Sequence, residues 1–226
     1  RRLVCPNFVT SVTKSQFSFE AKLPIATSRG IKKNKDPAVN KTLQRFLALL
    51  LHMSEVVWGE APSLQRPLLV VAFQGLFDAG ECATGAIDWI INHHKARRIA
   101  HIDPEEFYDF QEVRPEVYIN EEGDRLVRWP SLDVHVIENN LSHDLVLLQG
   151  IEPRMRWRTF CESVVEIATD TNCEMVVTLG AMAAGVPHSR PSEVKGSAAN
   201  PELARRLGLD RPSYQGPTGI IGTLHD

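Results

Sequence analysis

The chain has 226 residues, of which 43% are hydrophobic, so it is long enough to bury a full core as one large domain. Its 25 basic and 28 acidic side chains give a formal net charge of -3, which excludes a general electrostatic attraction to nucleic acid or to anionic membrane surfaces. Its apolar runs stay short of the roughly 18 residues that a membrane-spanning helix needs. We therefore expect neither a membrane nor a nucleic acid as partner.

The first part of the sequence differs in composition from the rest. Residues 1–40 are rich in Ser, Thr, Lys and Asn, which is typical of a mobile tail or of a strand laid over the body, with a nucleic-acid-binding arm as the weaker alternative. Over residues 38–57, apolar residues recur at helical spacing, which predicts an amphipathic helix whose apolar face needs the domain or another subunit as partner. We interpret residues 1–60 as an N-terminal extension and residues 63–226 as a single domain.

Strands and helices alternate along that domain. The two long helices are expected at residues 81–94 and 153–168, and a hairpin is expected where residues 117–119 and 126–129 flank a Gly-containing turn. Asp103 and Asn200, each followed by Pro, predict the starts of two short helices. The expected core strands are residues 68–73, 97–102, 133–137, 145–148 and 175–180. We predict an α/β fold of three layers, with helices on both faces of the sheet.

The end of the sequence and its cysteines carry further expectations. Residues 216–226 resemble a strand or turn that leads into a helix and then stops, which indicates a frayed end or a truncated product. Cys5, Cys82, Cys161 and Cys173 lack CxxC spacing, so we expect reduced thiols and a cytoplasmic protein without structural zinc. His93 and His94 are neighbours that point about 100° apart on a helix. We therefore predict no metal site, and we expect no cofactor.

Candidate chemistry lies in the loops that follow the core strands. Glycine-rich dinucleotide and phosphate loops and a nucleophile elbow are absent from the sequence. Asp78 and Glu152 each follow a core strand within a few residues. They are candidates for a pair of catalytic acids, and the alternative is that each carboxylate accepts backbone N–H bonds and caps the helix after it. Both interpretations stay open at this point.

A second group of candidates points to anion binding. His188 and Arg190 stand two residues apart between two prolines, and they can hold a carboxylate or phosphate, or a carboxylate of another subunit. Gln74, at the end of the first core strand, is a further candidate ligand-binding residue. Arg154, Arg156 and Arg158 alternate over two helical turns, which favours a solvated face but leaves room for an acidic partner.

Three phrases of the sequence together resemble a known family. They are Phe73–Gly80, the turn from Leu148 to Trp157, and Val186–Pro191, and from about Pro67 onward the chain resembles the family of the second proteasome assembly chaperone, in its actinobacterial branch. The resemblance implies a three-layer α/β fold similar to that of nucleoside phosphorylases and hydrolases. It also implies a non-catalytic chaperone role like that of the eukaryotic relatives, and a small homo-oligomer, for example a trimer.

Two functions of different class follow. The first is a non-enzymatic, assembly-chaperone-like protein-interaction module that forms homo-oligomers. The second is a phosphorylase-like or hydrolase-like enzyme acting on a small anionic or nucleoside-like substrate, with His188 and Arg190 holding the anion and Asp78 or Glu152 as acid or base. A fold shared with phosphorylases adds little to the second alternative, since one fold hosts many functions.

Overall fold

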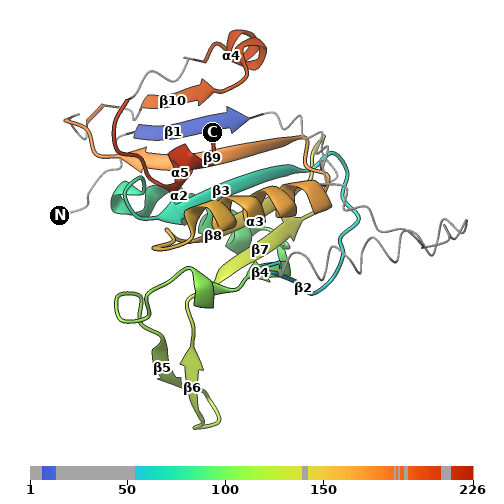
Figure 1. Ribbon diagram of the computed structural model, residues 1–226, viewed down its shortest axis with the longest axis vertical. Helices are drawn as coiled ribbons and strands as arrows, with labels where there is room; N and C mark the ends of the chain where they lie inside the picture. Colours follow the sequence, from blue (N-terminus) through green and yellow to red (C-terminus); the bar gives the residue numbers. More distant parts are fainter. Residues whose placement is uncertain are drawn as a thin grey trace, which may run out of the picture. The chain divides into compact units, whose positions relative to one another are not determined.

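The computed structural model describes residues 7–13, 54–138, 142–185, 187, 189–190, 193–209 and 215–225. The chain divides into two compact units, residues 1–15 with 56–226 and residues 16–55. All the helices and strands named below belong to the first unit (Figure 1).

The centre of this unit is a mixed sheet of eight strands, arranged in the order β10-β1-β9-β3-β8-β7-β4-β2. The strand β3 runs parallel to both of its neighbours, whereas β7, β4 and β2 continue the sheet in antiparallel pairs. The strands are β1 (Asn7–Thr13), β2 (Val56–Trp58), β3 (Leu68–Gln74), β4 (Arg97–Ile102), β7 (Leu132–Ile137), β8 (Leu145–Ile151), β9 (Met175–Met182) and β10 (Glu193–Ala198).

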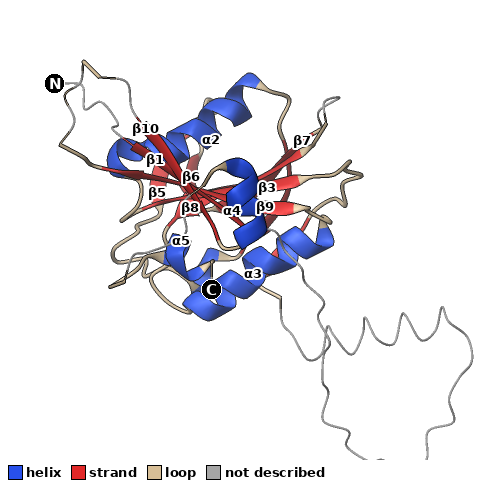
Figure 2. Ribbon diagram, turned by 90° about the horizontal axis from the view of Figure 1, so that it is seen from above, coloured by secondary structure: helices blue, strands red, loops and turns tan. Residues whose placement is uncertain are grey.

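Helices cover both faces of this sheet, which confirms the predicted three-layer α/β fold (Figure 2). Leu69, Val71 and Phe73 of β3 belong to the larger core cluster with α3 (Trp157–Asp170) and α5 (Ile220–Thr223). The intervening residues of β3 point to the other face and pack with α2 (Cys82–His93). The central strands therefore read as continuous apolar runs, because both of their faces are buried.

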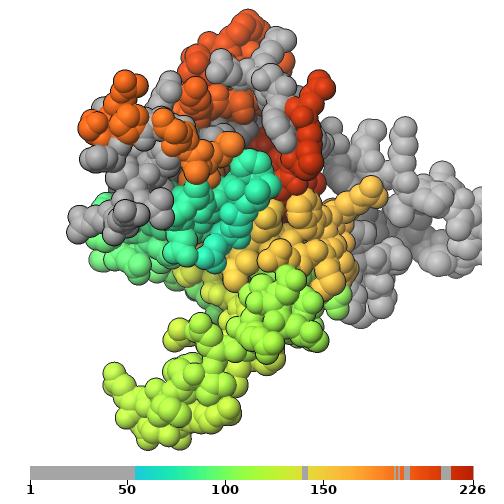
Figure 3. Space-filling view, turned by 90° about the vertical axis from the view of Figure 1, so that its left-hand side faces the viewer, coloured from blue at the N-terminus to red at the C-terminus, as the bar shows by residue number. Residues whose placement is uncertain are grey.

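Between β4 and β7 the chain forms a small two-stranded sheet of its own, made of β5 (Glu116–Ile119) and β6 (Arg125–Arg128). We call residues 116–128 the arm. It projects away from the main sheet, as the ribbon and the space-filling view both show (Figures 1 and 3). The turn between its strands is organised by Asn120, whose side-chain oxygen accepts the backbone N–H groups of Glu122 and Asp124.

Several sequence-based expectations are corrected by the structure. The helix expected over residues 38–57 does not reach its predicted end, since residues 56–58 form β2, and residues 38–53 lie outside the described residues. The helix expected from Pro153 begins only at Trp157, because Arg156 before it adopts a left-handed backbone conformation with φ 52°. Asp103 does cap a turn, accepting the backbone N–H of Glu105, but that turn is a single 3-10 element, η2 (Pro104–Glu106).

Other regions meet their expectations more closely. Of the two possibilities for the first 40 residues, residues 7–13 form a strand, which lies inside the sheet between β10 and β9. The arm is the predicted hairpin, and α4 (Pro201–Leu207) begins at the predicted cap Asn200. Among the described residues, no helix is long and apolar enough to cross a membrane.

The cysteines differ from the expectation of four reduced thiols. Cys82 is disulfide-bonded. Cys161 and Cys173 are free, and burial raises the pKa of each thiol to about 11. Both thiols are therefore protonated and poorly nucleophilic at neutral pH.

The aromatic contacts beneath α3 should dominate the stability of this unit. Phe160 is fully buried and meets the rings of Phe73 and Phe107 edge to face, with both centroid distances 5.3 Å. We expect Phe160→Ala to lower the free energy of unfolding by about 3–5 kcal/mol, through lost apolar contacts and a residual cavity. Urea denaturation followed by circular dichroism measures this. The neighbouring exposed Arg158→Ala serves as the control, and an equal loss in both variants would contradict the prediction.

Candidate functional site

The carboxyl ends of the parallel strands β3, β8 and β9 lie along one margin of the sheet, which we call the carboxyl-end edge. The loops that follow these strands meet there. The backbone N–H of Glu152, just after β8, donates to the carbonyl of Gln74 at 2.9 Å. The N–H of Ala181 on β9 donates to the carbonyl of Phe77 at 2.7 Å. Three of the residues singled out in the sequence, Gln74, Asp78 and Glu152, therefore lie at or near this edge.

Asp78 is held by the helix that follows it. Its carboxylate is buried, with 5% of the residue exposed, and one oxygen accepts the backbone N–H of Ala83 at 2.7 Å and that of Thr84 at 3.4 Å. The second oxygen accepts the Thr84 hydroxyl. Both oxygens thus bind groups of the first turn of α2, which is the arrangement of a helix cap.

Glu152 has a different role, because its carboxylate does not bind the helix that follows it. One oxygen accepts the backbone N–H of Ile220, at the start of α5, at 2.7 Å. The other accepts the N–H of Leu76, in the loop after β3, at 3.4 Å. The carboxylate therefore joins the loop after β3 to a segment that lies 68 residues beyond Glu152 itself.

Two glycines make room for this carboxylate. A Cβ atom at Gly75 would lie 2.6 Å from Oε2 and 2.9 Å from Cβ of Glu152. A Cβ atom at Gly219 would lie 2.7 Å from Oε1 of Glu152 and 3.0 Å from the ring of Phe77. Both approaches are shorter than real Cβ contacts, so the backbone on either side of Glu152 can come this close only because it lacks side chains.

The remaining candidate residues from the sequence are Gln74, Arg190 and His188. The side chain of Gln74 is exposed and donates to the carboxylate of Glu81 at 2.8 Å. Arg190 is exposed, and its backbone N–H donates to the carbonyl of Pro187 at 3.0 Å. His188 lies outside the described residues, so a pairing of His188 with Arg190 stays a prediction.

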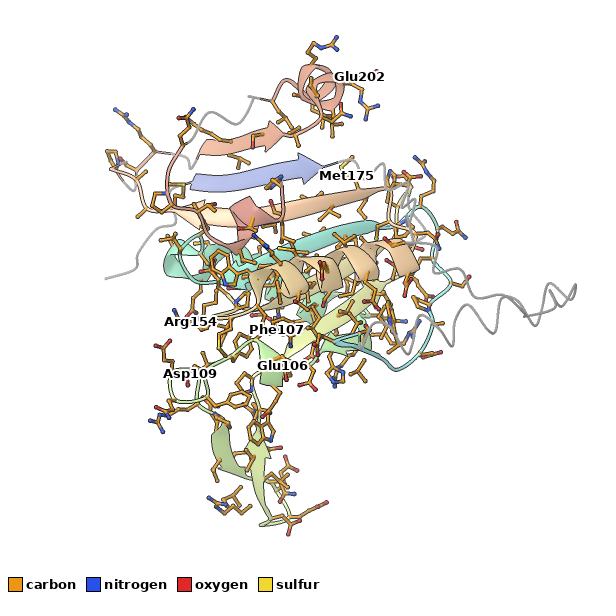
Figure 4. All side chains as sticks on the ribbon, viewed as in Figure 1. Glu106, Phe107, Asp109, Arg154, Met175 and Glu202 are labelled. Atoms are coloured by element: carbon orange, nitrogen blue, oxygen red, sulfur yellow. The ribbon has the colours of Figure 1, made fainter. Side chains whose placement is uncertain are left out.

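The loop after β8 is also fastened to the segment after β4, a contact that the sequence did not reveal (Figure 4). The N–H of Arg154 donates to the carbonyl of Phe107 at 2.8 Å, and the Tyr108 hydroxyl donates to the carbonyl of Ile151 at 2.7 Å. Burial of that hydroxyl raises the pKa of Tyr108, so it stays a donor. Arg154 also forms an ion pair with Glu112 at 3.1 Å.

Arg156 continues this attachment with an ion pair to Glu106, and its guanidinium lies 5.9 Å from the centre of the Phe107 ring. Arg154, Arg156 and Arg158 are all exposed, as the sequence favoured, and the first two pair with acidic side chains of this chain. The base of the arm is consequently anchored at the carboxyl ends of the parallel strands, since the segment after β4 leads directly into it.

The arm itself exposes apolar side chains on both faces. Val117 pairs with Val127 on one face, and Tyr118 pairs with Leu126 on the other. Ile119 is 62% exposed, and Trp129, just beyond the arm, is 54% exposed with its ring 5.2 Å from that of Phe110. The sequence predicted this hairpin but not its separation from the main sheet, because alternation along a strand does not show which sheet the strand joins.

Comparison with known proteins identifies the family of this chain. The model of the PAC2 family matches residues 72–226. The chain belongs to the PAC2 family. It is 41% identical to a PAC2-family protein from Streptomyces avermitilis, covering 70% of this chain and 68% of that one with a TM-score of 0.67.

Further relatives agree with that assignment. A proteasome-assembly chaperone homologue from Mycobacterium tuberculosis is 38% identical, covering 70% of this chain and 67% of that one with a TM-score of 0.62. An archaeal proteasome activator from Pyrococcus furiosus is 12% identical with a TM-score of 0.50, which is a likeness of fold alone. No protein with curated annotation matches the chain.

The glycines around Glu152 give this PAC2-family chain a direct test of the edge. We expect Gly75→Ala to lower the free energy of unfolding by about 1–3 kcal/mol, because the added methyl group displaces a carboxylate held by two N–H groups. Gly85→Ala is the matched control: Gly85 lies within α2 with nothing within 4 Å of its added Cβ, so it should raise stability by about 0.5–1 kcal/mol. Urea denaturation of both variants checks this, and equal shifts would contradict the role of Gly75.

Proposed function

We propose that this PAC2-family chain is a non-enzymatic, assembly-chaperone-like protein-interaction module that forms homo-oligomers. The observation that carries the proposal is the arm, which exposes apolar side chains on both faces of an isolated two-stranded sheet. A two-stranded hairpin is at best marginally stable alone in water, and exposed apolar patches mark sites of protein association. A protein partner would bury the surface that the arm leaves open.

The relatives support one class of partner. The Mycobacterium tuberculosis relative, 38% identical over 70% of this chain, is described as a proteasome-assembly chaperone homologue. By this likeness we infer that the partners of the chain are proteasome subunits, besides further copies of itself. The same likeness supports an intracellular site of action, as expected for a protein that acts on proteasome subunits in the cytoplasm.

The enzyme alternative receives less support from the geometry. A general acid or base has to exchange a proton with a substrate. Both oxygens of Asp78 accept hydrogen bonds from α2 in a buried position, and each oxygen of Glu152 accepts a backbone N–H. These bonds give both carboxylates a structural role, which supports the interaction module over acid–base catalysis by either residue.

The oligomeric state is the first test. In size-exclusion chromatography with light scattering, we expect the full chain to elute as a defined oligomer, with a mass that is a multiple of the 25.3 kDa of one chain. The full chain is needed, because removal of the first 60 residues would take β1 out of the middle of the sheet and β2 from its edge. A monomer over the whole range of concentration would contradict homo-oligomerisation.

A binding experiment separates the interaction module from the enzyme. Isothermal titration of the full chain with inorganic phosphate and with a purine nucleoside should show no saturable heat. Arg190→Ala should leave the heats unchanged, and Arg114→Ala is a matched control at another exposed arginine. Saturable phosphate binding that is lost in Arg190→Ala but kept in Arg114→Ala would support the enzyme instead.

A further inference from the structure

The two ends of the eight-stranded sheet carry features that complement each other. The arm leaves the sheet between β4 and β7, close to one end, whereas β10 is the last strand at the other end (Figure 1). We propose that the arm of one copy binds the edge formed by β10 and α4 of a second copy of this chain. This inference rests on the proposed homo-oligomerisation and names the surfaces that form it.

On the arm, the surface to be covered is apolar along the strands and acidic at the turn. Val117, Ile119 and Val127 share one face of the ribbon, by the register of β5 and β6. The turn at the far end carries Glu121, Glu122 and Asp124, and none of these three forms an ion pair with another described residue. Arg125, which lies opposite Ile119, is the charged residue on this face, so the turn is an acidic tip at the end of a face that is otherwise apolar.

The opposite end of the sheet presents the matching surface. Val194 of β10 is 63% exposed, and Leu207 at the end of α4 is 50% exposed. Arg205 and Arg206 stand in the last turn of α4, and neither forms an ion pair with another described residue. Within the part of the chain that the structure describes, no strand pairs with the outer edge of β10.

An open strand edge offers a row of backbone donors and acceptors to another strand. Addition of a strand to such an edge is a recurrent mode of association, in which main-chain hydrogen bonds give affinity and side chains give specificity. The arm can supply such a strand. Its apolar face would cover Val194 and Leu207 while its acidic turn meets Arg205 and Arg206.

A second copy of the chain is the occupant that these observations favour. Every copy carries both surfaces, and they lie at opposite ends of one sheet. One repeated contact therefore covers the arm and the edge of every copy in a closed ring. Because the two surfaces differ, the contact is head-to-tail, and it is satisfied in every copy where the rotation between neighbouring copies closes into a ring.

Charge reversal on the full chain tests the contact. We expect E121K/E122K, and separately R205E/R206E, to raise the apparent dissociation constant of the oligomer about tenfold or more, since each variant places like charges together. The variant with all four substitutions restores opposite charges and should return to within about threefold of the original value. Analytical ultracentrifugation over a concentration series measures these constants.

Single charge reversals of the same kind, placed away from the proposed contact, serve as controls. Glu162→Lys on α3 and Lys95→Glu after α2 are exposed and should leave the dissociation constant unchanged. A photo-crosslinker at position 122 gives an independent readout that does not depend on charge. In a mixture of isotopically light and heavy chains, it should yield mixed-isotope peptide pairs that join the arm to residues 201–207.

The outcomes separate this inference from the proposed function. An oligomer whose dissociation constant is unmoved by either charge reversal, or whose crosslinks map elsewhere, would overturn the arm-to-edge contact and leave homo-oligomerisation standing. A chain that is monomeric without any substitution would overturn both. Loss of assembly in both pairs of substitutions without recovery in the four-substitution variant would also count against the contact.

Discussion

The carboxylate of Glu152 is the contact on which the carboxyl-end edge of the sheet depends. Its two oxygens bind the loop after β3 and the start of α5, and its own backbone N–H binds the end of β3. α5 contributes the fully buried Ile220 to the main core cluster. One side chain therefore couples a loop, a strand end and a core residue that are widely separated in the sequence. A partly buried carboxylate that accepts N–H bonds is a strong acceptor, and leaving those N–H groups unpaired would be costly.

The contact made by Glu152 indicates that the acids at this edge are structural. The carboxyl ends of strands in α/β proteins are where ligands usually bind, so polar side chains there suggest a site. Here Asp78 caps α2 and Glu152 joins two segments, so the acids that attracted attention in the sequence stabilise the scaffold. This edge holds the arm in position, through the bonds between the loop after β8 and residues 106–112. In this chain the rim of the sheet thus serves as a base for an interaction element.

Much of the fold, but little of the candidate site, could be predicted from the sequence. Runs such as residues 68–73 and 145–148 are apolar on both faces, and that pattern has one simple explanation, a sheet covered twice. Long-range bonds leave no such pattern: the Glu152 carboxylate and the N–H of Ile220 meet across 68 residues. Gly75 and Gly219 were the available signal, since each stands where a side chain would strike Glu152. Neither glycine belongs to a phosphate-binding motif, so no sequence pattern connects them.

The uneven distribution of exposed apolar residues follows from the same topology. α2 and α3 cover the central strands, so the apolar side chains of β3 and β8 are buried within one chain. The arm lies beyond the reach of both helices, and within the described residues the short α4 is the helix that packs with β10. Selection against aggregation normally places charges on such exposed strands. The strands of the arm and β10 do carry single charged residues, and further charges of opposite sign gather at the turn of the arm and at the end of α4, while Ile119 and Val194 stay exposed. Charges arranged in this way leave the apolar strands open to association and restrict the partner to one whose charges are complementary.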